Sequence, residues 1–316
     1  MTENRAGAFA KVKKYLRRVL FRVVYPQWQP TQYSLVGMTS PLEQKYYQSC
    51  VSNVATMNGA IVDLGCWLCS TTIPLAKGLS SITDSTLTDS KKIYAFDRFI
   101  WESWMDPHMS NLYGIYRPGD SFLPEARKRV ENMRSFIELI PEDLTSYSWD
   151  AGPIRLLLVD AMKSDVLARS IVLSFFTSLI EGSLLIHQDF KHFYTSWIHI
   201  LQYRLRDCFS FDTEVPGSGT VSFRTIKRVS IGRAREASSG ILEANESEVQ
   251  EAFKYSLGLV KEELGKSAIA AAHVMYHVHC GQVQLARQTV TAYNHISHPI
   301  QGDFQLAIER VQALEA

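Results

Sequence analysis

The chain has 316 residues, 46% of them hydrophobic and 21% charged, which is the composition of a soluble globular protein with a large core. Its 33 lysines and arginines nearly balance 32 acidic residues and no base-reading motif is present, so we expect no nucleic-acid partner. No apolar run approaches the roughly 20 residues that span a bilayer, no secretory signal is evident, and the five cysteines are scattered. These features predict a cytoplasmic protein.

A basic amphipathic helix is predicted close to the N-terminus. Between residues 11 and 23, lysines and arginines surround valines and leucines at helical spacing. Two interpretations stay open. We prefer a first helix whose apolar stripe packs on the domain, and the alternative is weak contact with an anionic membrane surface.

The middle of the chain alternates apolar strands with helical stretches, which is typical of a parallel sheet built from βαβ units. The last two strands flank a Pro-Gly turn, so we expect the sheet to end in an antiparallel pair. The predicted fold class is therefore α/β: a doubly wound, mostly parallel, seven-stranded, Rossmann-like sheet. Its strands are predicted at residues 60–64, 92–96, 135–139, 154–159, 183–187, 208–213 and 220–226.

Three regions follow from this pattern: an N-terminal helical segment (1–58), the α/β domain (59–228) and a C-terminal helical extension (229–316). The extension breaks near residues 298–299, and we interpret it as a cap over the site or as an oligomerisation element of a homo-oligomer. Residues 101–124 are too aromatic for a passive linker. We predict that they form a lid or a substrate-pocket insertion.

A cofactor loop is predicted at the end of the first strand. The run Ala60–Leu64 is apolar apart from Asp63, and it leads through Gly65 directly into a predicted helix. Ligands of open parallel sheets collect beyond the carboxyl ends of the strands, so both residues stand where a small molecule docks. Asp97 ends the second strand, where a carboxylate can accept the ribose hydroxyls of an adenosine-containing cofactor.

Four segments, in the same order, are similar to motifs of the macrocin-type sugar O-methyltransferases, and the surrounding pattern resembles the class I S-adenosylmethionine-dependent methyltransferase fold. Residues 65–71 resemble the Gly-Val-Trp-x-Gly-Gly-Ser loop of that family, with Cys69 in place of a glycine. Residues 95–99, 158–162 and 181–190 resemble the segments that follow or form strands two, four and five. The resemblance covers roughly residues 60 to 190.

The resemblance implies that S-adenosylmethionine is the cofactor and assigns residues to each of its parts. The methionine part is expected to contact the first loop, the ribose the second strand end, and the adenine the neighbouring loops. In that order, the implied residues are Asp63, Gly65, Trp67, Ser70 and Thr71; Asp97; and Arg98, Phe99 and Asp143.

The family's metal site is only half present. In those enzymes, acids on strands four and five bind a divalent metal, typically Mg²⁺, that holds two sugar hydroxyls. Asp160 and Asp189 match, whereas the second acid at strand four is replaced near Met162, and Gln188 stands at the first of the paired aspartates. A Mg²⁺ site at the two matching acids stays open, but we do not expect an obligatory metal.

Without a metal, methyl transfer to a hydroxyl needs a general base. His187, at the carboxyl edge of the sheet, is the first candidate, ahead of His192 and His108. Asp160 ends strand four and, by the resemblance, faces the reaction centre. The predicted catalytic residues are therefore His187 and Asp160.

Two other constellations compete with this interpretation. Cys66 and Cys69 form a Cys-x-x-Cys motif at a strand-to-helix junction, where dithiol redox sites occur. His273 and His277 share one helix face at a spacing that can bind zinc, but no glutamate follows the first of them, and we interpret both as packing or interface residues.

The sequence thus favours an S-adenosylmethionine-dependent methyltransferase that acts on an oxygen of a small-molecule acceptor, a sugar or a glycosylated natural product. The alternative of another class is a non-catalytic protein of the same fold that serves as a subunit or scaffold. A nicotinamide-dependent reductase is disfavoured because the first loop lacks the Gly-x-Gly-x-x-Gly spacing.

Overall fold

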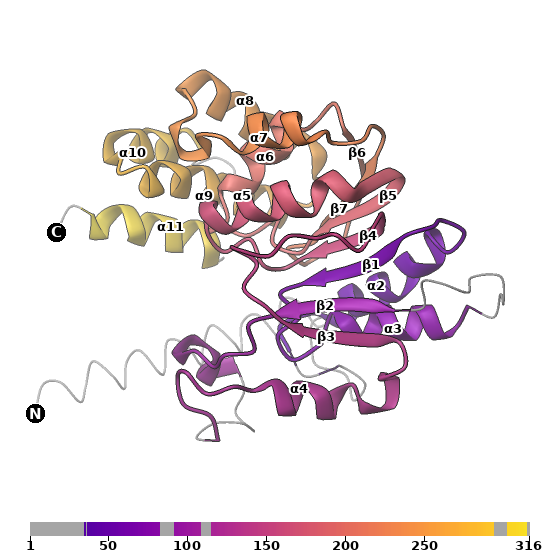
Figure 1. Ribbon diagram of the computed structural model, residues 1–316. Helices are drawn as coiled ribbons and strands as arrows, with labels where there is room; N and C mark the ends of the chain where they lie inside the picture. Colours follow the sequence, from indigo (N-terminus) through magenta and orange to yellow (C-terminus); the bar gives the residue numbers. More distant parts are fainter. Residues whose placement is uncertain (1–34, 36, 83–91, 109–114, 294–301, 315–316) are drawn as a thin grey trace, which may run out of the picture.

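The computed structural model describes residues 35, 37–82, 92–108, 115–293 and 302–314. A seven-stranded sheet lies at its centre, with the strand order β3-β2-β1-β4-β5-β7-β6 (Figure 1). Strands β1 to β5 are parallel, β7 is antiparallel to β5, and β6 is antiparallel to β7. The predicted fold class is confirmed. The predicted basic helix and the helix break at 298–299 lie outside the described residues.

The strands agree closely with the predicted ones, and the first and the fourth have the predicted bounds. The largest difference is β5, which begins four residues before the predicted position 183, ahead of Gly182. The strands are β1 (Ala60–Leu64), β2 (Ile93–Asp97), β3 (Ile137–Pro141), β4 (Ile154–Val159), β5 (Leu179–His187), β6 (Phe209–Glu214) and β7 (Val221–Thr225).

Helices cover both faces of the sheet because successive strand residues point to opposite sides. Ile61 and Leu156 belong to one apolar cluster, together with α2 (Pro41–Asn53), α3 (Thr72–Ser80) and α4 (Leu123–Arg129). Val62 and Leu157, one residue further along each strand, belong to the cluster on the other face. That cluster includes α5 (Asp165–Ser174), α6 (Trp197–Arg204), α7 (Ile231–Ser238), α8 (Glu246–Leu259) and α9 (Glu263–His279).

Helix α2 is fixed to the far end of the sheet by buried hydrogen bonds. A capping box of Ser40 and Glu43 starts the helix. The Tyr47 hydroxyl lies 2.8 Å from that of Thr220, which in turn donates to the Glu43 carboxylate at 2.8 Å. These bonds place the segment before α2 beside the carboxyl ends of the strands.

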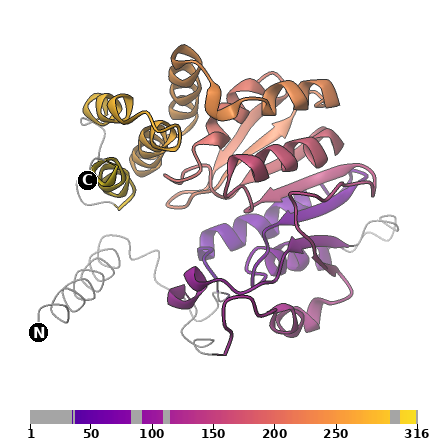
Figure 2. The same ribbon diagram turned by 60° about the vertical axis from the view of Figure 1, so that its left-hand side comes forward.

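The C-terminal helices α10 (Val283–Ala292) and α11 (Gly302–Ala313) form a smaller cluster with one side of α9. Figures 1 and 2 show these three helices as a group at one side of the molecule. None of the helices in the described ranges has both the length and the apolar character that crossing a membrane requires.

The loop after β1 passes very close to the end of β4. The backbone N–H of Asp160 donates to the carbonyl of Leu64 at 2.8 Å. Gly65 has a φ of +85°, and a Cβ added there would lie 2.6 Å from the carbonyl oxygen of Asp160. Only glycine satisfies both the backbone conformation and the space.

We expect Gly65→Ala to lower the free energy of unfolding by at least about 3 kcal/mol, because strain and a backbone clash add together. Gly152→Ala is the matched control: its φ is +91°, but a Cβ there meets nothing within 4 Å. That variant should lose only about 1 kcal/mol. Urea unfolding measures both, and equal losses would show that the close approach to β4 has no energetic weight.

Candidate functional site

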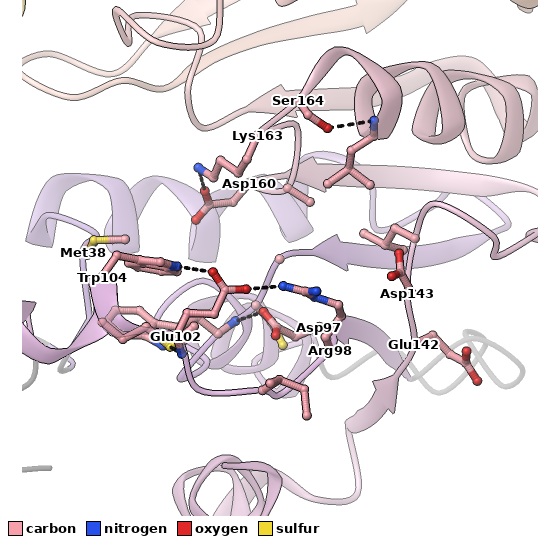
Figure 3. Close-up of a pocket in the computed structure, with 18 of the residues that line it drawn as sticks. Met38, Asp97, Arg98, Glu102, Trp104, Glu142, Asp143, Asp160, Lys163 and Ser164 are labelled. Carbon is pink, nitrogen blue, oxygen red and sulfur yellow. Dashed lines mark hydrogen bonds and ion pairs between the residues drawn. The ribbon is translucent and has the colours of Figure 1, made fainter. Parts of the chain in front are cut away.

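A cavity of about 530 Å³ opens at the carboxyl ends of β1, β2 and β4 (Figure 3). This is the edge where ligands of doubly wound sheets bind. The walls come from the segment before α2, the loops after the strands, and the start of α5. The lining includes seven predicted site residues: Gly65, Trp67, Ser70, Asp97, Arg98, Asp143 and Asp160.

The loop after β1 holds two residues in left-handed backbone conformation, Trp67 with a φ of +43° and Cys69 with a φ of +64°. Such values are uncommon outside glycine and concentrate at functional sites. The resembling family has glycine at the position of Cys69, and glycine is the residue that adopts this conformation without strain. The indole nitrogen of Trp67 is buried without a hydrogen-bond partner among the described residues.

The thiols of this loop do not suit redox chemistry. Cys66 and Cys69 are both buried and free. Burial, together with the neighbouring Cys69, raises the pKa of Cys66 well above its usual value. A reactive dithiol needs an accessible thiolate, so the structure argues against the Cys-x-x-Cys interpretation.

Asp63 lies beneath the loop and does not line the cavity. The hydroxyls of Thr71 and Thr72 donate to one carboxylate oxygen at 2.8 and 2.6 Å, and the other oxygen has no partner among the described residues. Burial, opposed by these two bonds, raises the pKa of Asp63 to about 6. Thr71 is therefore also a support of the loop, turned toward Asp63 under the cavity floor.

Asp97 is held by backbone donors at the cavity wall. The N–H groups of Trp67 and Phe99 donate to its two carboxylate oxygens at 3.0 and 2.8 Å. Each oxygen keeps a second acceptor site, so the carboxylate can still receive two hydroxyl groups. The ring of Phe99, by contrast, is fully buried against Phe122 and does not reach the cavity, which contradicts its predicted place beside an adenine.

Part of the aromatic insertion closes one side of the cavity. Ile100 lines it together with Glu102, Trp104 and Met105 from the insertion predicted at residues 101–124, of which residues 109–114 lie outside the described part of the chain. The Trp104 indole donates to Glu102 at 2.8 Å, and Glu102 also forms an ion pair with Arg98. The ring of Trp104 is 46% exposed and lies 5.8 Å from that of Trp67.

Asp143 lies on the opposite wall, in the loop after β3 (Figure 3). Its Oδ1 accepts from the backbone N–H and the hydroxyl of Thr145 at 2.9 and 2.7 Å, and these bonds lower the pKa of Asp143. The carboxylate is exposed and ionised, so it can accept from an amino group.

Lys163, which the sequence analysis did not single out, occupies the centre of the predicted metal site. Its ammonium donates to Asp160 Oδ1 at 2.8 Å and also to Asp189 Oδ2. Gln188, with its amide oriented to satisfy both of its polar groups, donates to Oδ1 of the same two aspartates at 3.1 and 2.8 Å. A cation already neutralises these carboxylates, so the residues do not fit a Mg²⁺ ion, and the prediction of a metal at Asp160 and Asp189 is not supported by the geometry.

The pKa of Asp160 is raised above the usual value for an aspartate, and that of Asp189 is lowered below it. Burial, partly offset by the Lys163 ammonium, raises the pKa of Asp160 to about 7. For Asp189, the attraction of Lys163 and His192 outweighs burial and lowers the pKa. Burial would lower the pKa of Lys163, but both carboxylates raise it above its usual value, so this lysine carries its proton. Environments that separate two carboxylates in this way are typical of acid–base sites.

His187 does not reach the cavity, contrary to its predicted role as the general base. Its side chain is 2% exposed and lies against the rings of Phe176, Phe190 and Phe223. Burial lowers the pKa of His187 to about 4. No histidine is among the described residues that line the cavity, so His192 and His108 do not replace it.

The comparisons with known proteins find similarity to solved structures but to no family model or curated sequence. Among solved structures, the chain is similar to the O-methyltransferase NovP, with 14% identity, a TM-score of 0.48 and coverage of 65% of this chain and 88% of that one. It is also similar to CalS11, a TDP-rhamnose 3′-O-methyltransferase of calicheamicin biosynthesis (11% identity, TM-score 0.43, coverage 67% and 93%). A third similar structure is phosphoethanolamine N-methyltransferase 1 of Haemonchus contortus, with 13% identity, a TM-score of 0.41 and coverage of 80% of this chain and 58% of that one.

We expect Asp63→Asn to stabilise the ligand-free protein at alkaline pH. Because the pKa of about 6 in the folded protein exceeds the usual aspartate value of 3.8, stability is lost as pH rises toward 6 and stays lower above it. Removing the charge should therefore add up to about 3 kcal/mol at pH 8, and this gain should shrink toward pH 4. Denaturant unfolding at both pH values checks this, with the exposed Asp150→Asn as control. A variant less stable than wild type at pH 8 would contradict the account.

Proposed function

We propose that this protein is an S-adenosylmethionine-dependent methyltransferase that methylates a hydroxyl group of a sugar or glycosylated small molecule. The observation that carries the proposal is the cavity at the switch edge of the sheet. It brings together the strained loop after β1, Asp97 at the end of β2, and Asp160 after β4, whose pKa is about 7. The strand order with its antiparallel β7 is the arrangement expected of the resembling class I fold.

The residues at the cavity fit this cofactor. Asp97 presents acceptor sites for two ribose hydroxyls, and Asp143 presents one for the adenine amino group. The loop through Gly65, Trp67 and Ser70 supplies a wall for the methionine part. When bound, S-adenosylmethionine supplies a methyl group that its sulfonium already activates.

Asp160 is the base that the geometry favours. Lys163 and Gln188 both donate to its Oδ1, and no described residue donates to Oδ2. Figure 3 shows Asp160 and Lys163 across the cavity from Trp104 and Glu102. With a pKa of about 7, Asp160 is half ionised near neutral pH and can take the acceptor's proton on Oδ2. Lys163 holds the carboxylate in place through Oδ1.

The acceptor class is inferred from the remaining lining. Trp104 and Trp67 offer adjacent aromatic faces, and Glu102 and Lys163 offer charged hydrogen-bonding groups beside them. Apolar ring faces combined with hydroxyl partners suit a sugar ring. Positioning the acceptor hydroxyl against Oδ2 of Asp160 supplies most of the catalysis, because the methyl donor needs no further activation.

Cofactor binding is the first test. S-adenosylmethionine and S-adenosylhomocysteine at about 100 times their Kd should stabilise the protein by about 2.7 kcal/mol, whereas NADH should not. Asp97→Asn should weaken binding at least about tenfold in calorimetric titration, since one charged acceptor is lost. Asp150→Asn, an exposed acid that does not line the cavity, should bind as wild type. Stabilisation by NADH instead would favour the reductase alternative.

The pH profile tests the base. With methyl-labelled cofactor and a panel of sugars and glycosides, turnover should rise with pH to a plateau above about pH 7. Asp160→Asn should lower kcat roughly 10²- to 10⁴-fold while cofactor affinity is kept. Lys163→Met removes the cation that lowers the pKa of Asp160, so the rising limb should move to higher pH. If the rising part of the pH profile stays in place in Lys163→Met, the pairing of Lys163 with Asp160 as the base is excluded. A protein that binds the cofactor but methylates none of the acceptors would favour the scaffold alternative.

A further inference from the structure

A second cluster of ligating groups lies away from the cavity, between the start of α8 and the middle of α9. One ring nitrogen each of His273 and His277 and one carboxylate oxygen of Glu246 lie within 4.8 Å of one another. Both imidazoles are at least 99% buried, whereas Glu246 is exposed. None of the three lines the cavity. Figures 1 and 2 show the two helices beyond the sheet, next to α10.

The hydrogen bond of His277 fixes which nitrogen is free. Nδ1 lies 3.0 Å from Oε1 of Gln282, an oxygen that can only accept, so Nδ1 carries the proton. Nε2 is then a bare lone pair. It has no hydrogen-bond partner among the described residues, and it lies 3.9 Å from Oε2 of Glu246. The buried lone pair therefore faces a second acceptor with no described donor between them, and a cation between the two atoms would satisfy both.

His273, one helical turn earlier, can adopt the same tautomer, because the hydroxyl beside its Nδ1 is able to accept as well as to donate. Its Nδ1 lies 2.9 Å from the hydroxyl of Tyr293, and its Nε2 is buried without a described partner. The ring stacks on Phe253 with a centroid distance of 4.2 Å and an interplanar angle of 3°, which fixes its orientation. In metal sites, a ligating histidine bonds through its other nitrogen to a neighbouring oxygen, and both histidines do so here.

We propose that His273, His277 and Glu246 bind one Zn²⁺ ion through the two Nε2 atoms and a carboxylate oxygen. Imidazole and carboxylate ligands suit this metal, and three protein ligands leave one position for water. Ligands at about 2.0–2.1 Å from zinc are roughly 3.3 Å apart, so donors that lie up to 4.8 Å apart must approach one another by as much as about 1.5 Å. Glu246 can move its own carboxylate oxygen inward because its side chain is 45% exposed.

The ion would join the start of α8 to a part of the chain that hydrogen bonds already link to both ends of α10. Glu246 begins α8, the histidines lie in α9, Gln282 stands just before α10, and Tyr293 just after it. A metal that fixes both imidazoles therefore also fixes their partners at each end of α10. We assign it a structural role in the C-terminal helices, independent of the proposed methyl transfer.

Zinc content and stability of the full-length protein test the site. Chelator-stripped protein should take up one Zn²⁺ per chain, and at about 100 times the Kd its Tm should rise by about 5 °C. Co²⁺ in its place should give the intense visible absorption of a four-coordinate ion, which the hydrated ion lacks. No uptake, or uptake with the spectrum of the hydrated ion, would overturn the proposal.

Variants locate the ion. Glu246→Gln should weaken Zn²⁺ binding at least about tenfold, since even partners one shell further out contribute 10- to 100-fold. His273→Phe, which keeps a ring on Phe253, should abolish it. Glu251→Gln is the control, an exposed acid on the same helix that pairs with Lys254 at 3.4 Å, and it should bind Zn²⁺ as wild type. Equal affinity in Glu246→Gln, His273→Phe and the control would place the metal elsewhere and overturn the assignment.

Discussion

The close approach of the loop after β1 to the end of β4 is the constraint on which the site depends. The backbone at Gly65 lies so close to the carbonyl of Asp160 that no side chain fits between them, and the ends of β1 and β4 form one continuous surface. The loop then has to turn through left-handed conformations at Trp67 and Cys69 before α3 can begin. Along this path, the backbone N–H of Trp67 donates a hydrogen bond to the Asp97 carboxylate, and Asp63 is buried beneath the loop. The carboxyl ends of β1, β2 and β4 therefore line one cavity, because the loop after β1 has almost no conformational freedom.

Much of this arrangement was predictable from the sequence. Apolar runs located the central parallel strands, and the Pro-Gly turn located the antiparallel pair, because both patterns reflect burial and backbone sterics directly. Seven of the predicted site residues line the cavity for the same reason: they follow strands whose carboxyl ends must share an edge. The early start of β5 was missed because Gly182 interrupts the apolar run with a residue typical of turns.

Side-chain direction explains the incorrect assignments. On β5, Leu185 faces the core beneath α5 and α6, and the two-residue period of a strand sends His187 to that same side. The alternation alone therefore indicates a buried histidine, contrary to the role of general base that we predicted for it. Phe99 differs, since its left-handed backbone, with a φ of +53°, turns the ring toward Phe122, and no local pattern reveals that turn. Lys163 was missed because charge pairing across two loops depends on the folded chain.

The two clusters of potential metal ligands differ in what completes them. At Asp160 and Asp189, an ammonium and an amide already donate to the carboxylates, so the site is electrically balanced by its own side chains. At His277, the proton lies on the outer nitrogen and the inner lone pair faces a carboxylate oxygen, and Nε2 of His273 is buried beside them without a described partner. Ligand type alone favours the first cluster for a hard cation, as the family resemblance suggests. The proton inventory reverses that preference, because a metal adds stability only where acceptors converge without a donor of their own.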